Sequence, residues 1–303
     1  MKFMSILRNR SGACPTDGQH QRNVQETVIR AAAGWRTIDF SELWRYRGLL
    51  YFFAWRDIKV RYKQTWLGAA WAIIQPLMTT GVFVVLFGLL LGKGNEPTIP
   101  GIPYVLSTFC AMLPWQLFAN SLHRAGNSLL AEKALVTKVY FPRLILPLSS
   151  VLSGLVDFAI GLGALVVMLI CFGVAPSWPL IFLPLFVAAA VVASLAIGLW
   201  MAALSALYHD FQHGLPFLVR IGMYVSPVIY TTSYAKALLP SWVFNLYCLN
   251  PMTGVIEGFR WSMLGGNWPP GVSLLPSALV TLVLLVAAMY FFRRMERTVV
   301  DVI

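Results

Sequence analysis

The chain has 303 residues, of which 58% are hydrophobic and only 12% are charged. A soluble domain of average composition carries about 25% charged residues and about 45–50% apolar ones. A soluble enzyme, a disordered regulator and a nucleic-acid-binding domain are therefore excluded as first interpretations. The formal net charge of +11 does not restore nucleic-acid binding, because a basic footprint needs a polar face to sit on. The composition instead indicates a protein of the lipid bilayer.

Six apolar runs are candidates for membrane-spanning helices. A helix that crosses the hydrocarbon layer needs roughly 20 apolar residues; five runs reach that length and one falls slightly short. In chain order the runs are Leu67–Leu91, Ile102–Leu122, Leu144–Val174, Trp178–Tyr208, the short Leu215–Tyr230, and Val272–Phe292. The sequence therefore predicts an all-α integral membrane fold, with six transmembrane helices in residues 67–303.

The stretch between the fifth and sixth runs, Thr231–Gly271, has a different composition. It is rich in Pro, Gly, Trp and Asn and is too interrupted for a full span. Backbone that is not helical survives at membrane depth only when it is buried in protein or lines a water-filled cavity. A membrane-dipping hairpin and an external cap both remain open for this stretch.

The basic residues predict the orientation of the chain. Of the 23 Lys and Arg residues, 20 fall on one side of the predicted membrane, and only Lys93, Lys236 and Arg260 fall on the other. Lys and Arg are enriched on the cytoplasmic side of membranes, and an even number of spans puts both termini on the same side. We expect a multi-pass membrane protein with both termini in the cytoplasm.

The segment before the first span divides into two parts. Residues 1–40 are expected to form a flexible cytoplasmic tail, and residues 41–66 an amphipathic interfacial element. Within the latter, Trp44–Lys63 mixes aromatic rings with Arg and Lys, which suits the cytoplasmic headgroup layer. Alternation with period two over Asp57–Lys63 is typical of a strand, but an isolated strand would leave its edges open, so a helix is preferred. A simple positive-inside anchor is the alternative.

Asp157 is the one carboxylate in the middle of a predicted span. An acid inside a membrane is costly and faces protein or water. A proton or cation site is one interpretation, and a hydrogen bond to a neighbouring helix is the other. The second is favoured, because the spans supply no further acid, His or Lys at depth.

Each predicted span also contains a proline, which removes a backbone donor and bends a helix, although membrane helices tolerate proline. Hinges that open a path and simple tolerance are equally compatible with the sequence. The six prolines are Pro76, Pro114, Pro147, Pro184, Pro227 and Pro276.

Some aromatic residues fall inside the predicted spans rather than at their ends, namely Trp71, Trp115, Phe118 and Tyr224. A sugar ring offers an apolar C–H face, so these side chains could line a channel for carbohydrate. Packing in a core or at the membrane interface is the commoner role of such residues.

The sequence offers no evident site for catalysis, a metal or a nucleotide. Gly88–Gly94 is the nearest thing to a phosphate loop, but it lacks the G-x-x-x-x-G-K-[ST] spacing. His209, Asp210 and His213 lie in a short loop with no further carboxylate, so a solvated turn is preferred to a metal site. The four cysteines form no spaced pairs and indicate neither disulfides nor zinc. We therefore expect no cofactor in this chain.

The loop His123–Arg143 contains a short amphipathic stretch, Ser128–Lys138, whose apolar residues are Leu129, Leu130 and Leu135. A short helix of this kind under the membrane suits docking into a groove of a partner protein. A plain connecting loop is equally compatible with these residues.

Five strings, in this order along the chain, resemble the membrane subunits of bacterial polysaccharide ABC exporters, the ABC-2 type permeases that export O-antigen, capsule or teichoic acid. The strings are RDIKVRYKQTWLGAAWAIIQPL from Arg56, LVTKVYFPRLILPLSSVLSGLVDF from Leu135, YHDFQHGLPFLVRIGMYVSPVIY from Tyr208, NPMTGVIEGFRW from Asn250, and the C-terminal FFRRMERTVVDVI. The resemblance runs from about Leu43 to Ile303. One departure is His209–Asp210, where an Arg–Asp pair is expected.

The resemblance implies a homodimer in the bacterial inner membrane, with six spans per subunit and two copies of a separate ABC ATPase that binds ATP and Mg²⁺. It implies re-entrant helices between spans five and six, and a channel for a lipid-linked glycan. It also implies that the stretch between spans two and three couples to the ATPase. The residues assigned to that coupling are Ser128, Leu129, Leu130, Glu132, Lys133, Leu135 and Lys138.

The function that the resemblance implies is ATP-driven export of lipid-linked, O-antigen-like polysaccharide from cytoplasm to periplasm, with this chain as a transport subunit and not an enzyme. Four basic residues could attract the diphosphate of the substrate where it enters: Arg56, Lys59, Arg61 and Lys63. An ABC-2 exporter of a small molecule or lipid is one alternative. A membrane enzyme acting on lipid-linked sugars is another, but its catalytic candidates, Glu257 and Arg260, are too few to support it.

Overall fold

The computed structural model describes residues 40–63, 68–90, 102–175, 177–208, 210–265 and 271–302. The secondary-structure elements within these ranges are all helices, so the all-α prediction is confirmed. The predicted flexible tail, residues 1–40, lies outside the described residues except for Phe40, where the first helix begins.

The described part of the interfacial element, residues 41–63, is helical, as expected. α1 covers Phe40–Arg45 and α2 covers Arg47–Lys63. The alternating residues Asp57–Lys63 form the last turns of α2. A helix satisfies its backbone donors and acceptors internally, whereas a lone strand at a bilayer would leave them open.

Among the residues that the structure describes, four helical segments are long and apolar enough to cross a membrane. They coincide with the first, third, fourth and sixth predicted runs. The first, Gly68–Gly88, is built from η1 (Gly68–Ala70), α3 (Trp71–Phe83) and the π-helical η2 (Val84–Leu90). The others are α6 (Ile145–Cys171), Trp178–Leu207, which comprises η4 (Trp178–Phe182) and α7 (Leu183–Leu207), and Ser273–Met295 within α12 (Gly271–Val302).

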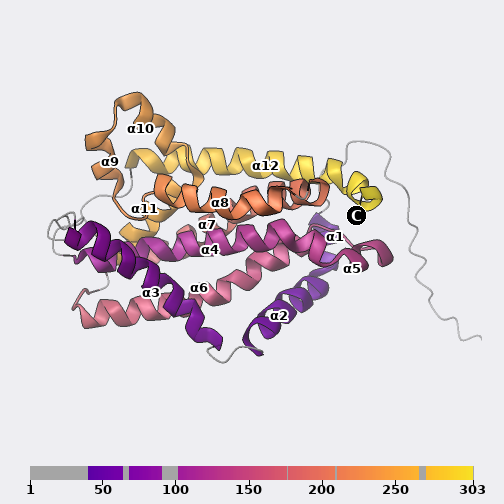
Figure 1. Cartoon of the computed structure of the whole chain (residues 1–303), viewed down its shortest axis with the longest axis horizontal. Helices are drawn as coiled ribbons and strands as arrows, with labels where there is room; N and C mark the ends of the chain where they lie inside the picture. The colour runs from indigo at the N-terminus through magenta and orange to yellow at the C-terminus, as the bar shows by residue number, and fades with distance from the viewer. Residues whose placement is uncertain are drawn as a thin grey trace, which may run out of the picture. The chain divides into compact units, whose positions relative to one another are not determined.

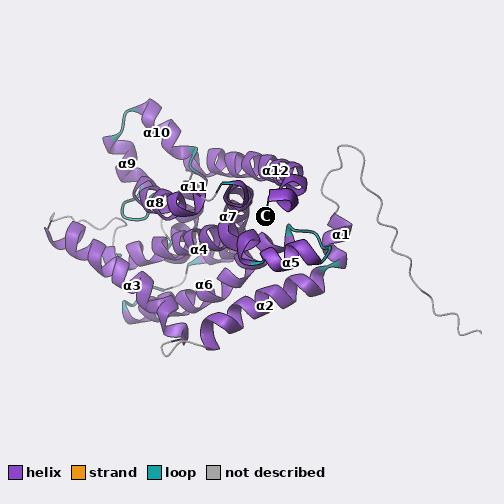
Figure 2. Ribbon diagram, turned by 45° about the vertical axis from the view of Figure 1, so that its right-hand side comes forward, coloured by secondary structure: helices purple, strands orange, loops and turns teal. Residues whose placement is uncertain are grey.

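The second and fifth predicted runs form helices outside this group of four. α4 (Tyr104–Ala131) has 28 residues, or about 42 Å of helix, but it carries polar residues such as Gln116 and Asn120. Of its 28 residues, 19 are buried, because α4 runs through the middle of the bundle and packs against α6 and α7 (Figures 1 and 2). α8 (Asp210–Val225) has only 16 residues, fewer than a perpendicular span needs.

The stretch between α8 and α12 is more regular than its composition suggests. It forms α9 (Thr232–Leu238), α10 (Ser241–Cys248) and α11 (Pro251–Leu264). α9 and α10 lie at the opposite end of the bundle from α5, the short helix Lys133–Lys138 (Figure 1). α11 returns into the bundle, where 11 of its 14 residues are buried. The stretch therefore contains a two-helix end piece and one inserted helix.

Local chemistry explains where α11 begins and ends. The side-chain oxygen of Asn250 accepts a hydrogen bond from the N–H of Met252 at 3.0 Å, which caps the helix start. Pro251 occupies the first helical position, where its missing N–H costs nothing. Gly265 adopts a positive φ of 72° at the other end, a conformation that glycine reaches without a steric penalty.

Only half of the predicted hinge prolines lie in helix interiors. Pro76, Pro114 and Pro276 do so, in α3, α4 and α12. Pro147 and Pro184 lie in the first turns of α6 and α7, and Pro227 lies in the turn after α8. A proline in a first turn removes no intrahelical hydrogen bond, and Pro227 lies outside a helix. A bend within a helix is therefore expected only at the first three prolines.

Two apolar cores hold the helices together. The larger surrounds α4 and includes residues of α6, α7 and α11. The smaller lies near α5, where Phe53 of α2 contacts Phe141 with ring centroids 6.0 Å apart. Because Phe53 is buried in this smaller core, α2 is packed against the bundle and does not merely rest on lipid.

Candidate functional site

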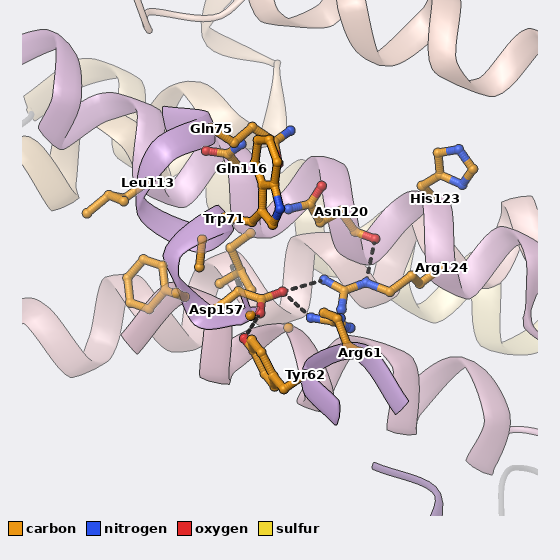
Figure 3. Close-up of a pocket in the computed structure, with 15 residues that line it drawn as sticks. Arg61, Tyr62, Trp71, Gln75, Leu113, Gln116, Asn120, His123, Arg124 and Asp157 are labelled. Carbon is orange, nitrogen blue, oxygen red and sulfur yellow. Dashed lines mark hydrogen bonds and ion pairs between the residues drawn. The ribbon is translucent and has the colours of Figure 1, made fainter. Parts of the chain in front are cut away.

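Asp157 of α6 accepts hydrogen bonds from three side chains on two other helices (Figure 3). Arg61 Nη1 and Tyr62 Oη reach it from the end of α2, and Arg124 Nη2 of α4 lies 3.3 Å from its Oδ2. The Nε of Arg124 donates in turn to the backbone carbonyl of Asn120 at 3.1 Å. The expected hydrogen bond from Asp157 to a neighbouring helix is confirmed. We call Asp157, Arg61, Tyr62 and Arg124 the Asp157 cluster.

The sequence signal for these partners was incomplete. The partners of Asp157 were sought as a second acid, His or Lys within the spans, so its arginine partners were missed. Arg124 follows the second predicted run by two residues, and Arg61 lies in the interfacial element. Asp157 lies twelve residues along α6, about 18 Å of helix from its start. The end of α2 therefore reaches well along the bundle to meet it.

The burial of the Tyr62 phenol, together with its hydrogen bond to Asp157, raises its pKa to about 12. Both effects favour the neutral form, because an ionised phenol next to a carboxylate would be repelled. Tyr62 therefore remains a hydrogen-bond donor to Asp157 at physiological pH.

A cavity of about 350 Å³ opens beside the Asp157 cluster and is bounded by α2, η1, α3, α4 and α6. Its wall combines apolar side chains with polar ones, and Gln75, Gln116, Asn120 and His123 lie beside the cluster. Trp71 also lines it, and 51% of this residue's surface is exposed. The cavity is within the size range of small-ligand sites. We call it the α3–α4 pocket.

The predicted diphosphate-attracting residues separate into two pairs on α2. Arg56 turns toward the protein, where its Nη2 lies 2.6 Å from Glu132 and 3.0 Å from Asp57, and Arg61 binds Asp157. Lys59 and Lys63 are exposed instead. Their face of α2 also exposes aromatic residues, and Lys59 Nζ lies 5.7 Å from the ring centroid of Trp55. Only Lys59 and Lys63 therefore present fully exposed cations.

The predicted coupling stretch is not one continuous helix. α4 continues to Ala131, Glu132 breaks it with φ −106° and ψ 26°, and α5 follows over Lys133–Lys138. Ser128 and Leu129 are buried within the chain's own core, while Leu130, Glu132 and Leu135 are half-buried. The exposed surface that remains for a partner is formed by Ala131, Lys133, Ala134, Thr137, Lys138, Val139 and Tyr140.

The four candidate channel aromatics also differ in their surroundings. Trp115 and Phe118 are 4% and 5% exposed and pack on each other at 5.3 Å between centroids. They are core residues in this subunit. Trp71 and Tyr224 each expose about half of their surface, and Tyr224 meets Phe83 edge-on, which links α8 to α3. Only Trp71 borders the α3–α4 pocket.

Glu257 and Arg260, the catalytic candidates of the enzyme alternative, form a buried ion pair at 2.8 Å. Arg260 is only 2% exposed, and its Nη2 donates to the carbonyls of Pro227 and Val228 at 2.8 and 3.3 Å. The backbone N–H of Thr232 donates to Glu257 at 2.9 Å. The pair thus fixes the turn after α8 against α11, and neither group faces an open site.

The remaining polar loop falls partly outside the described residues. His209 is among the residues that the structure does not describe, as is Lys93. Asp210 begins α8 and His213 lies one turn further on. In the described part of the chain, no group of three His, Cys, Asp or Glu side chains is arranged to hold a metal ion.

The fold and its polar features define a class before any comparison is made. Within the described residues, four apolar helical segments are long enough to cross a bilayer, and three of them pack against the largely buried helix α4. The pocket beside α4 is lined by both polar and apolar side chains. This is the organisation of a membrane transport protein, in which polar groups inside the membrane face a path or each other.

Comparison with known proteins identifies the family. The ABC-2 type transporter family matches residues 48–264, and the chain belongs to it. The O-antigen export system permease protein RfbA of Myxococcus xanthus is 29% identical over 83% of this chain and 94% of its own length. RfbA of Klebsiella pneumoniae is 26% identical over 70% and 78%, and the polysialic acid transport protein KpsM of Escherichia coli is 23% identical over 80% and 91%.

Family membership fixes the general role of the chain. It is a membrane-spanning transport subunit rather than an enzyme, and it works with an ABC ATPase. The chain itself supplies the membrane-embedded helices.

Proposed function

We propose that this chain is the transmembrane subunit of an ATP-driven exporter that moves lipid-linked, O-antigen-like polysaccharide from cytoplasm to periplasm. The observation that carries the proposal is the near full-length match to permeases named for O-antigen export, which covers 94% of the Myxococcus xanthus relative. A relative named for polysialic acid transport also aligns over 91% of its length. Relatives named for two different polysaccharides favour a glycan cargo over a small molecule or lipid.

The topology in this proposal has six spans and both termini in the cytoplasm of a bacterial inner membrane. α4 supplies the second span, because its 28 residues form a helix longer than the hydrocarbon layer is thick. α8 supplies the fifth as a short helix that the turn after it extends toward α9. α9, α10 and α11 then form the periplasmic re-entrant region. The distribution of Lys and Arg supports this orientation.

The assembly in this proposal is a homodimer bound to two ATPase subunits. Exposed apolar side chains along α8, such as Phe217 at 65% and Leu218 at 55%, are available for a second subunit or for lipid. ATP-driven closure of the ATPases displaces α5, whose exposed Lys133 and Lys138 face away from the bundle. The Arg56–Glu132 ion pair at 2.6 Å carries this displacement to α2.

The exposed cations Lys59 and Lys63 attract the diphosphate of the lipid carrier to the outer face of α2. Phosphate oxygens accept strong charge-assisted hydrogen bonds from ammonium groups. Arg56 and Arg61 serve a different purpose, because their carboxylate partners already neutralise much of their charge. They hold α2 against α4 and α6.

The test is a chromosomal deletion followed by complementation. Deletion should abolish surface polysaccharide and cause lipid-linked glycan to accumulate in the cytoplasmic leaflet. The wild-type gene should restore export, but only with a partner ATPase that can hydrolyse ATP. If deletion leaves surface polysaccharide unchanged and instead removes resistance to a drug or depletes a membrane lipid, the small-molecule or lipid alternative is favoured. Glycosyl transfer by the purified chain without an ATPase would favour the enzyme alternative.

A further inference from the structure

The α3–α4 pocket carries more positive than negative charge. Two guanidinium groups, Arg61 and Arg124, line it against a single carboxylate, Asp157. Both guanidinium groups approach the same oxygen of that carboxylate, so they lie next to each other (Figure 3). Two adjacent cations with one anion in a half-buried site favour binding of a further anion.

Two buried polar atoms in the pocket wall have no hydrogen-bond partner among the described residues: Arg124 Nη1, a donor, and Gln116 Oε1, an acceptor. A buried polar atom without a partner costs about 1–3 kcal/mol, so a ligand that satisfied both would be favoured. A phosphate oxygen accepts from Arg124, but it offers nothing to Gln116. A hydroxyl group donates to Gln116. The two atoms together therefore suit a phosphate ester that also bears hydroxyl groups.

The remaining wall suits a sugar ring. Trp71 borders the pocket with half of its surface exposed, and an indole face packs well against the C–H face of a pyranose. Figure 3 shows Gln75, Gln116 and Asn120 beside the Trp71 ring, with the Asp157 cluster below them. An aromatic ring surrounded by amides, with a cationic group adjacent, is the complement of a sugar attached to a phosphate.

We propose that the α3–α4 pocket binds the phosphate-proximal sugar of the lipid-linked glycan, with the sugar ring on Trp71, a hydroxyl group on Gln116 and a phosphate oxygen on Arg124. The inference rests on the proposed function, and it names the part of the substrate that this site recognises. The pocket adjoins the end of α2, whose opposite face carries Lys59 and Lys63. The lipid carrier therefore reaches the pocket from the headgroup layer.

The same chemistry is present in bilayer lipids, because phosphatidylglycerol also joins hydroxyl groups to a phosphate. The test must separate these sources. The full-length chain, bound to its ATPase in nanodiscs, is titrated with a polyprenyl diphosphate that bears one sugar. The same titration uses the sugar-free polyprenyl diphosphate, and phosphatidylglycerol is added as a competitor.

Three variants probe the pocket: Trp71→Ala, Gln116→Leu and Arg124→Gln. The matched control is Trp242→Ala, because Trp242 is 68% exposed, lies on α10 and is outside the pocket wall. Loss of one hydrogen bond or one stacked ring should lower the affinity for the sugar-bearing probe by about tenfold. Trp71→Ala and Gln116→Leu should leave the affinity for the sugar-free probe unchanged, whereas Arg124→Gln should lower the affinity for both probes. Trp242→Ala should bind both probes like the wild type.

The inference would be overturned if all variants bound the sugar-bearing probe with equal affinity, or if the wild type did not bind it. The pocket would then be a water-filled cavity. Displacement of the sugar-bearing probe by phosphatidylglycerol would also overturn it, because the occupant would then be a bilayer lipid. Glycan export by the wild-type complex is measured in parallel. If the pocket variants bind the sugar-bearing probe and export glycan like the wild type, the pocket inference is contradicted but the proposed function is not. If the wild-type complex exports no glycan, the proposed function is contradicted.

Discussion

Arg61, two residues before the end of α2, is paired with Asp157 in the middle of α6, 96 positions further along the chain. This contact joins the helix that precedes the first span to the interior of the bundle. Arg124 reaches the same carboxylate from α4 at 3.3 Å, so a single acid holds three helices. The structural role that the sequence favours for this acid is thus confirmed, and the acid is the centre of a network beside a pocket.

Replacing this acid tests the network. Asp157→Asn removes the negative charge and leaves the guanidinium groups of Arg61 and Arg124 facing each other. Loss of one partner of a fully buried ion pair costs about 3–5 kcal/mol. Since the side chains here are 19–29% exposed, we expect about 1–3 kcal/mol. The thermal unfolding midpoint in detergent should fall, and Tyr62→Phe should lower it less, because it removes one hydrogen bond and no charge.

Asp57→Asn is the matched control for Asp157→Asn. Asp57 also binds an arginine, but Arg56 retains Glu132 at 2.6 Å. Its unfolding midpoint should stay close to that of the wild type. Equal destabilisation by the two substitutions would show that the Asp157 cluster contributes nothing special to the bundle.

The link between α2 and the coupling segment can be measured by a double-mutant cycle. Arg56→Ala and Glu132→Ala each break the 2.6 Å ion pair, whose side chains are 35% and 25% exposed. A pair this exposed should show a coupling free energy of about 1 kcal/mol. In the ATPase complex, we expect both variants to hydrolyse ATP at near wild-type rates but to export less glycan per ATP.

The control for the double-mutant cycle is Arg47→Ala, since Arg47 lies on the exposed face of α2 and contacts Trp44. It should preserve the ratio of export to hydrolysis. A coupling free energy of zero, or an unchanged ratio in Arg56→Ala, would contradict a role of this pair in transmitting the movement of α5.

How far the sequence predicts this architecture depends on what each feature requires. The four strongly apolar spans follow from hydropathy alone, because their outer faces meet lipid. α4 carries amides at Gln116 and Asn120, which lower its mean hydropathy. The apolar run Ile102–Leu122 nevertheless predicts a helix there. Gln116 and Asn120 face the α3–α4 pocket, and other helices cover most of the remaining helix surface. Sequence cannot reveal that cover, since it depends on helices distant in the chain.

The orientation of the charged helix α2 is harder to predict. The four cations in its C-terminal half are equivalent in the sequence, but Arg56 and Arg61 turn inward to Glu132 and Asp157, while aromatic residues turn outward. The amphipathic pattern is thus the reverse of a soluble helix. The partners lie 76 and 96 positions away, and no local periodicity encodes such contacts. The same limitation placed buried Leu129 on a predicted docking surface.

The buried pair on α11 should be indispensable for folding. Arg260→Ala would leave Glu257 as an uncompensated buried charge and the carbonyls of Pro227 and Val228 without a donor. We expect a loss of about 3–5 kcal/mol, seen as aggregation or loss of the monodisperse peak in size-exclusion chromatography. Arg260→Lys should rescue only partly, since an ammonium group lacks the planar fork that serves all three acceptors. A stable, monodisperse Arg260→Ala would refute this account.

Two glycines should respond in opposite ways to the same substitution. A Cβ on Gly258 of α11 would lie 1.9 Å from a ring carbon of Phe186, which is buried in the larger core. Gly258→Ala should therefore cost about 1–3 kcal/mol by overpacking. A Cβ on Gly163 of α6 would meet no other group within 4 Å, so Gly163→Ala should be neutral or stabilise by up to about 1 kcal/mol. Thermal unfolding in detergent compares them.

A second substitution makes the glycine prediction specific. Phe186→Leu removes the ring that the new methyl group meets, so the double variant with Gly258→Ala should recover part of the lost stability. Additive losses in the double variant would indicate that Gly258 matters for a reason other than its approach to Phe186.

The proposed orientation of the chain can be tested with its own cysteine. Cys171 is exposed at the end of α6, whereas Cys110 and Cys248 are buried, and α6 has 27 residues, or about 40 Å of helix. α5 lies near the beginning of α6 (Figure 1). A membrane-impermeant maleimide should therefore label Cys171 in spheroplasts from the outside, and Cys171→Ser should abolish this labelling. Lys138→Cys, added to Cys14→Ser and Cys171→Ser, should react only after the membrane is permeabilised. Labelling of the Lys138→Cys variant in intact spheroplasts would place α5 on the periplasmic side, out of reach of a cytoplasmic ATPase.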